Sequence, residues 1–168
     1  FKNEVYWVCF KSRGDTMDVK YINAVCRATE GIFQNYFGLT SKPLAPYAGK
    51  FAVDSRQVSV ILGVHGQLKG QIICSFELDT AKKIVGLMMG GIEVEEIDDM
   101  GWSAIQEFGN WIAGTSATEI STEGVIVDVT PPVVNEGNSI FRSHNIFISV
   151  PMQSEIGVIE VHISLKKD

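Results

Sequence analysis

Residues 103–114 read SAIQEFGNWIAG, and the helix that this stretch predicts determines how the rest of the chain is interpreted. An α-helix turns by about 100° per residue, so positions four, seven and eleven residues apart return to one side. The residues that share one narrow face in this way are Ser103, Glu107, Asn110 and Gly114. The apolar residues on the opposite side, which predict a buried stripe, are Ile105, Phe108 and Ile112.

The polar face of this helix has an ordinary interpretation as well as a functional one. Glutamate is a common helix former, and Glu-x-x-Asn occurs by chance in many proteins, so a solvated face without a role is one hypothesis. Two costs argue against it. Asn110 is a poor helix-interior residue because its side chain competes for backbone hydrogen bonds. Glycine at 101, 109 and 114 weakens the helix further, and Gly109 and Gly114 are expected to leave its backbone unshielded.

The surrounding sequence predicts an α+β fold in which long helices pack on an antiparallel β-sheet. Apolar residues at three- and four-residue steps predict helices over residues 18–37, 79–89 and 98–120. Runs of β-branched and aromatic residues predict strands over residues 3–10, 50–54, 57–64, 67–76, 125–129, 145–150 and 157–165. The order helix, strands, short helix, helix, strands indicates two related halves.

Turn and cap residues set the expected ends of these elements. Gly38 should stop the first helix in a left-handed conformation. Asp79 or Thr80 should cap the second helix, and Gly90-Gly91 should close it. Residues 65–66, His-Gly, lie between two predicted strands and indicate a hairpin.

The start of the first predicted helix also suggests the domain organisation. Met17 directly precedes that helix, so we interpret it as the natural start of a single domain over residues 17–168. Residues 1–16 are then an N-terminal extension, either a native upstream segment or one foreign to the protein.

Composition and charge exclude several classes of function. The chain has 168 residues and a net charge of −6, and its basic residues are scattered, which is unfavourable for binding nucleic acid. Its three cysteines form no CxxC pair and its three histidines have no metal-ligand spacing, so we expect buried free thiols and no metal site. No apolar run approaches the roughly 20 residues that a membrane helix needs, which makes the cytoplasm the expected location.

The motif Ser103-x-x-x-Glu107-x-x-Asn110 resembles the Asp/Ser-x-x-x-Glu-x-x-Asn phosphatase motif of the CheC/CheX/FliY family of chemotaxis proteins. Residues 109–114, GNWIAG, are similar to that family's Gly-Asn-x-x-x-Gly helix. Further similarity lies in residues 21–24 (YINA), 87–91 (LMMGG) and 130–132 (TPP). The resemblance covers about residues 17–167, nearly the whole chain. The prolines of the TPP segment would also mark where the sheet bends or ends.

This resemblance implies a phosphatase that acts on the aspartyl phosphate of a CheY-like response regulator. Asn110 would hold the attacking water in line, as a glutamine does in many GTPases. Glu107 would pair with the regulator's active-site lysine, and Ser103 and Gly114 would contact the partner. The Mg²⁺ that such chemistry needs would belong to the regulator, and no cofactor is expected in this chain.

Members of the family carry one or two copies of the motif. The equivalent stretch of the first predicted helix is Thr16-x-x-x-Lys20-x-x-Asn23, in which lysine replaces glutamate and would repel the regulator's lysine. We therefore expect one site per chain, as in the CheX branch. The resemblance to those members implies a homodimer in which the two subunits are joined through their sheets. Strands as apolar as these would also be stabilised if a second subunit covered an edge of the sheet.

Three alternatives remain open from the sequence. The first is a non-catalytic module of the same fold that binds a response regulator or belongs to the flagellar switch. The second is a family-like domain with a different partner. The third is an unrelated small-molecule enzyme, which lacks support because the chain has no P-loop and no G-x-S-x-G motif. The intact Ser/Glu/Asn face favours the phosphatase.

Overall fold

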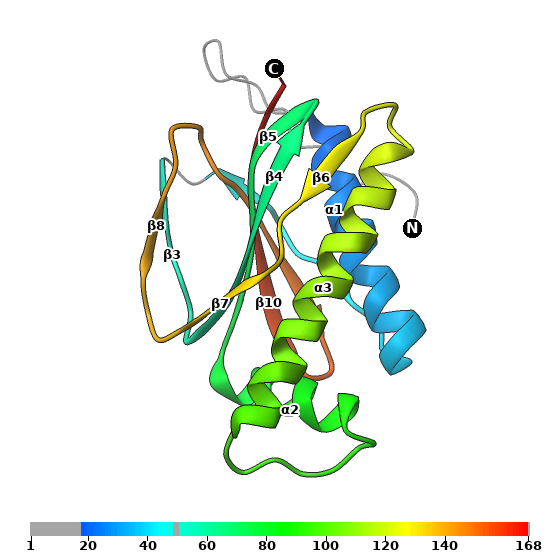
Figure 1. The fold of residues 1–168 in the computed structure, drawn as a ribbon, viewed down its shortest axis with the longest axis vertical. Helices are drawn as coiled ribbons and strands as arrows, with labels where there is room; N and C mark the ends of the chain where they lie inside the picture. The colour runs from blue at the N-terminus through cyan, green and yellow to red at the C-terminus, as the bar shows by residue number, and fades with distance from the viewer. Residues whose placement is uncertain (1–17, 49–50, 168) are drawn as a thin grey trace.

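A computed structural model describes residues 18–48 and 51–167 and places two long helices on one face of a β-sheet (Figure 1). The helices are α1 (Val19–Ile32), the π-helical turn η1 that continues it (Phe33–Phe37), α2 (Leu78–Met88) and α3 (Asp99–Ser121). Asp18 and Asp98 cap α1 and α3, because their carboxylates accept hydrogen bonds from the backbone N–H groups of Lys20 and Gly101. Gly38 follows η1 with φ of 65°, as predicted.

Within the described residues, the strands form one eight-stranded sheet and one two-stranded sheet, and every pairing is antiparallel. The strands are β1 (Lys42–Pro43), β2 (Tyr47–Ala48), β3 (Ala52–Asp54), β4 (Val58–Gly66), β5 (Leu68–Phe76), β6 (Val127–Val129), β7 (Val133–Glu136), β8 (Ile140–Arg142), β9 (Ile148–Ser154) and β10 (Gly157–Lys167). The large sheet has the order β1-β9-β10-β5-β4-β6, with β2 beside β9 and β7 beside β4. The predicted α+β class and the β4–β5 hairpin are confirmed.

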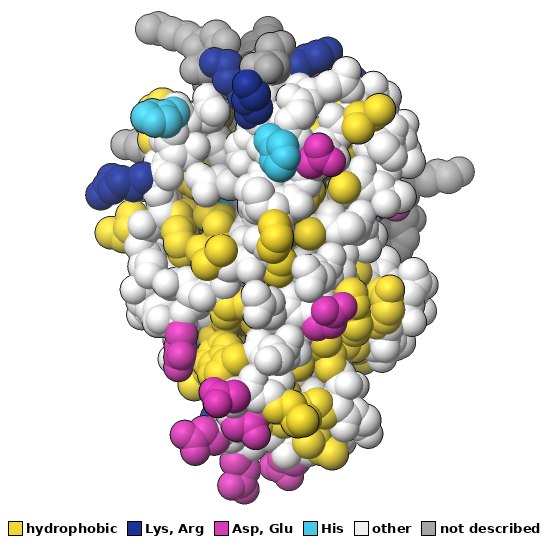
Figure 2. Space-filling model, viewed as in Figure 1, with side chains coloured by type: hydrophobic (Ala, Val, Ile, Leu, Met, Phe, Trp, Pro, Cys, Tyr) yellow, Lys and Arg dark blue, Asp and Glu magenta, His cyan; other side chains and the backbone are white. Residues whose placement is uncertain are grey.

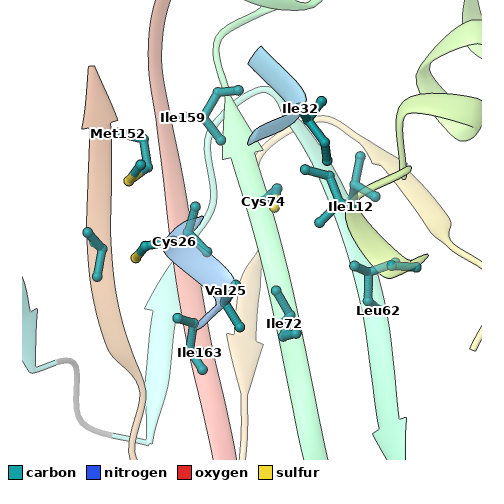
Figure 3. Packing of buried hydrophobic residues seen from close by; sticks show 14 of the residues in the cluster. Val25, Cys26, Ile32, Leu62, Ile72, Cys74, Ile112, Met152, Ile159 and Ile163 are labelled. Carbon is teal, nitrogen blue, oxygen red and sulfur yellow. The ribbon is translucent and has the colours of Figure 1, made fainter. Parts of the chain in front are cut away.

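The main core lies between the large sheet and the helices α1 and α3. Because side chains alternate between the faces of a strand, every second residue of β4, β5 and β10 points toward the helices. Figure 3 shows Val25 of α1 and Ile112 of α3 in this layer with Ile72 of β5. The two cysteines in the described part of the chain, Cys26 and Cys74, are buried and free, as expected. Burial raises the pKa of the Cys74 thiol to about 12.

A second, smaller core covers the opposite face of the large sheet. There the two-stranded sheet of β3 and β8 packs over Ile73 and Phe147. The large sheet therefore lies between this small sheet and the helices (Figure 1). Buried serine and histidine side chains occupy much of the same face. Ser59 and Ser75 are hydrogen-bonded across β4 and β5, with their Oγ atoms 3.0 Å apart.

The predicted cap of α2 is wrong by two to three residues. The helix begins at Leu78 after Glu77, whereas Asp79 or Thr80 was expected to precede it. The backbone N–H of Leu78 donates instead to Oε1 of Gln57, at 2.8 Å. A side chain 21 residues earlier therefore supplies the cap, which no local motif indicates. Gly90 and Gly91 close the helix with φ of 87°, as predicted.

Four strands of the described chain, β1, β2, β7 and β8, were not predicted. The Thr130-Pro131-Pro132 segment does interrupt the sheet, because β6 and β7 pair with different parts of β4 on either side of it. Thr130 holds the interrupted segment against β4 through two hydrogen bonds with Gly63. Its N–H donates to the carbonyl of Gly63 at 2.8 Å, and its Oγ1 accepts from the N–H of Gly63 at 2.9 Å. Pairing therefore resumes after the prolines rather than ending there.

Some predictions lie outside the described residues. These are the strand at residues 3–10, the role of Met17 as the start of the domain, the thiol of Cys9, Thr16 of the second motif copy, and Lys50 at the start of the third predicted strand.

Candidate functional site

Helix α3 presents the predicted polar face to solvent and the predicted apolar stripe to the core. Ile105, Phe108 and Ile112 are all completely buried, which confirms the stripe. The residues predicted for the exposed face, Ser103, Glu107, Asn110 and Gly114, are indeed exposed. The helix is thus anchored along one side and free along the other.

Glu107 and Asn110 contact each other. Asn110 Nδ2 donates a hydrogen bond to Glu107 Oε2 at 3.2 Å, one turn back along the helix. The amide keeps one N–H and its carbonyl oxygen for other partners, and the carboxylate keeps most of its acceptor capacity. The pair therefore offers an orienting amide and an anionic group side by side, which suits recognition of a water and a cation.

The two glycines near this pair have different roles. A Cβ on Gly114 would have no atom within 4 Å, so this position leaves open space at the surface. A Cβ on Gly109 would lie 2.7 Å from both Pro132 Cβ and Val60 Cγ1. The expectation that Gly109 leaves the backbone unshielded is therefore wrong. Its missing side chain allows the Pro132 segment and β4 to approach α3 closely.

An aromatic pair borders the site on the α1 side. The rings of Tyr36 and Trp111 are stacked, with centroids 4.2 Å apart and an interplanar angle of 12°. Trp111 directly follows Asn110, and Tyr36 is 58% exposed. The π-helical turn η1 brings Tyr36 to this place. Sequence reasoning missed the pair, although the aromatic run in residues 33–37 was a usable signal.

The α1 counterpart of the motif differs in chemistry. Lys20 occupies the position in α1 that corresponds to Glu107 in α3. Its ammonium group lies 3.7 Å from the carboxylate of Asp18. Asn23 is half-buried, and its Oδ1 is buried without a hydrogen bond. Arg27, one turn further along, binds Glu119 of α3 and Glu123 just after α3, at 3.0 Å each, and so links α1 to the C-terminal end of α3. The described part of this stretch of α1 has no exposed pair of a carboxylate and an amide. This agrees with the expectation of one site per chain, which stays a prediction.

A second polar cluster lies on the far face of the sheet and resembles a hydrolase triad in composition. Ser149 Oγ and His162 Nδ1 are 2.6 Å apart, and His162 Nε2 lies 3.5 Å from Glu160 Oε2. Ser149 is completely buried, so it is not accessible to a substrate as a nucleophile. The cluster is continued by Arg56, which donates to Glu160 and Glu77 at 2.8 Å. We interpret this cluster as a structural network that links β10 to the connection between β3 and β4.

The side chains of His162 and Arg56 favour the ionised form of Glu160 in this network. The adjacent His162 ring and the Arg56 guanidinium lower the pKa of Glu160 from its ordinary value of 4.5 to about 2, against the opposite effect of burial. The carboxylates of Glu160 and Glu77 in turn raise the pKa of Arg56.

The described residues contain no cluster of three or more His, Cys, Asp or Glu side chains with the geometry of a metal site. Within the same residues, no helix is long and apolar enough to cross a membrane.

Comparison with known proteins identifies the family. Residues 58–153 match the family model described as chemotaxis phosphatase CheX. The CheY-P phosphatase CheX of Thermotoga maritima is 31% identical over 153 residues, which cover 89% of this chain and 98% of that protein. A CheC-like superfamily protein from Shewanella sp. PV-4 superposes with a TM-score of 0.78 at 24% identity, over 89% of this chain and 99% of that one.

A third relative was solved with its partner. It is CheX of Borrelia burgdorferi, in a complex with CheY, BeF3 and Mg²⁺, with a TM-score of 0.66 at 24% identity over 88% of this chain and 98% of that one. The superposition with the Shewanella protein shows that the two chains share this fold. The chain therefore belongs to the CheX family of chemotaxis phosphatases.

Proposed function

We propose that this protein hydrolyses the aspartyl phosphate of a CheY-like response regulator and that Asn110 and Glu107 carry the reaction. The observation that carries the proposal is the hydrogen-bonded, exposed Glu107–Asn110 pair on a helix anchored by a buried stripe. Membership of the CheX family and the relative solved with CheY supply the substrate class. The cytoplasm, where chemotaxis regulators act, is the proposed location.

Asn110 acts by positioning water. An acyl phosphate is already activated, so hydrolysis needs mainly a water molecule held in line with the bond between phosphorus and the aspartate oxygen. The Asn110 carboxamide enters the regulator's active site and accepts a hydrogen bond from that water. The water oxygen then bonds to phosphorus, the aspartate carboxylate leaves, and inorganic phosphate is released. A rigid helix suits this role, because small errors of position cost large factors in rate.

Glu107 acts by recognition. Its carboxylate binds the ammonium group of the regulator's active-site lysine, a charge-assisted contact that is desolvated once the proteins dock. The contact fixes the register of α3 against the regulator and holds Asn110 at the phosphate. Ser103 and Gly114 lie on the same face and contact the partner. The Mg²⁺ that neutralises the phosphoryl group belongs to the regulator.

The proposal is tested by mixing the protein with a CheY-like regulator phosphorylated by a small-molecule phosphodonor and following phosphate release. We expect release to be faster than from the regulator alone, and to rise to a limit as the protein is increased. Regulators that bind the protein without faster release would favour the alternative of a non-catalytic docking module. Absence of both binding and stimulation would favour a domain with another partner.

A further inference from the structure

A groove lies directly beside the candidate site, between the first two turns of α3 and the strand β7. It has a volume of about 440 Å³, and Ser103 of the site face forms part of its wall. The residues that give the groove its apolar surface are Trp102, Pro132, Val133 and Val134. Val133 is 61% exposed, so its side chain is available at the wall of the groove for contact with a partner.

The groove is built on rigid elements. At its upper end α3 touches the Pro132 segment, because Gly109 has no side chain and allows the close approach. Gln106 Nε2 donates to the carbonyl of Pro132 at 3.4 Å, a weak bond that adds to this contact. The groove itself is open to solvent between α3 and β7. A ligand there would therefore meet a preformed surface in a fixed register with Glu107 and Asn110.

The charge around the groove is negative. Asp99 and Glu136 line it and are exposed, and within the part of the chain that the structure describes neither is paired with a basic side chain. The residues that add negative charge just before α3 are Glu93, Glu95, Glu96 and Asp98. Figure 2 shows acidic side chains gathered at the lower end of this face, with most Lys and Arg side chains at the upper end. A positively charged partner would be favoured here.

We propose that this groove receives an apolar side chain of the response regulator, flanked by lysine or arginine, and so selects which regulator is accepted. The inference rests on the proposed function, because it takes the regulator as the occupant. An apolar centre with a charged rim is the usual anatomy of a specific interface. The Val133 and Trp102 surfaces bury the apolar side chain, and Asp99 and Glu136 bind the basic residues beside it. The groove contributes to association and does not touch the phosphate.

The test uses Val133→Glu, which places a carboxylate in the groove at a position exposed enough to tolerate it. We expect the concentration of protein that gives half the maximal dephosphorylation rate to rise at least tenfold, with the rate at saturation unchanged. Glu136→Gln should weaken association severalfold and reduce its dependence on salt. The matched control is Ile126→Glu, because Ile126 is 73% exposed just before β6 and does not line the groove. It should behave as wild type, and both glutamate variants should unfold at similar temperatures.

A binding measurement separates this inference from the proposed function. Association with the BeF3-treated regulator can be followed by calorimetry without any hydrolysis. If Val133→Glu binds as tightly as wild type, the groove proposal is wrong, even where Asn110→Ala shows that the phosphatase proposal holds. If Val133→Glu loses binding but wild type never speeds phosphate release, the groove stands and the phosphatase proposal fails. A loss of self-association in Val133→Glu, with regulator binding unchanged, would instead make the groove an interface between two copies and overturn the inference.

Discussion

Asn110 Nδ2 donates a hydrogen bond to Glu107 Oε2 at 3.2 Å, so the two polar residues of the α3 face form one unit. An exposed pair one turn apart contributes only about 0.2–0.5 kcal/mol to a helix, so its value is in orientation rather than in stability. The carboxylate limits the rotation of the amide and directs it along the exposed face. A change at Glu107 should therefore affect both the affinity for the regulator and the placement of Asn110.

The first prediction separates these two effects by comparing Glu107→Gln with Glu107→Ala. Glutamine removes the charge but can still accept the hydrogen bond from Asn110, so its rate at saturation should stay within a few-fold of wild type. Its affinity for the phosphorylated regulator should fall about tenfold or more, since a charge-assisted contact contributes roughly 1.5–3 kcal/mol. Alanine removes the charge and the orienting acceptor, and should lower both quantities.

Single-turnover dephosphorylation at increasing protein concentration gives the affinity and the saturating rate separately. Glu107→Lys should weaken association more than Glu107→Ala, because it places a cation against the regulator's lysine. Unchanged affinity in Glu107→Lys would contradict the assigned contact.

The second prediction concerns Gly114. A Cβ there meets no atom within 4 Å, so Gly114→Ala should stabilise the free protein by about 1 kcal/mol through helix propensity. The same methyl group should hinder a partner that approaches the helix backbone, and lower the affinity for the regulator. Gly31→Ala in α1 is the matched control, because its Cβ would meet only Asn35 Nδ2, at 4.0 Å. Thermal unfolding and regulator binding should both be measured, and equal binding by the two variants would exclude Gly114 from the interface.

The α3 site could be predicted from sequence because its information is local. Helical periodicity alone separates the exposed Glu107 and Asn110 from the buried Phe108, and the structure confirms that separation. The start of α3 was predicted within one residue, since the predicted helix begins at Asp98 and the observed one at Asp99. The catalytic roles are a different matter, since they come from the resemblance to the family and stay predictions.

The missed features depend on contacts between distant residues. Gln57 caps α2 from 21 residues away, and β7 forms because Thr130 carries the chain past two prolines to pair again with β4. Gly109 looks like an exposed helix glycine in sequence, yet Pro132 packs against it in the fold. The aromatic residues of η1 indicate that this segment packs against other residues. They do not predict the π-helical turn that brings Tyr36 against Trp111.

The third prediction is a pH dependence of stability that comes from Glu160. Its pKa is lowered to about 2 in the folded protein by His162 and Arg56, so the folded state favours the ionised carboxylate. This stabilisation is present above the ordinary pKa of 4.5 and is lost as the pH falls from there toward 2. The free energy of unfolding in urea should therefore decrease over that range. Glu160→Gln should be less stable at neutral pH and show a flatter profile, and an equally steep profile in the variant would contradict the account.

The fourth prediction is that the protein is a homodimer, as expected from its apolar sheet and from the CheX branch that it resembles. The described surface carries large exposed apolar residues at Phe51, just before β3, and at Ile140, in β8. Light scattering should report twice the mass of one chain at micromolar concentration. The mass of a single chain would contradict this prediction without affecting the site.

The most direct test of the central claim is the saturating single-turnover rate of Asn110→Ala with a phosphorylated CheY-like regulator. Loss of one contact made in the transition state typically costs about 3 kcal/mol, so the rate should fall by roughly a hundredfold while regulator binding stays nearly intact. Ser121→Ala, at the exposed C-terminal end of α3 and outside the motif, is the control and should keep the wild-type rate at saturation. A hundredfold loss confined to Asn110→Ala is the result that the account predicts. Equal saturating rates for wild type and Asn110→Ala would contradict it and leave α3 as a docking surface.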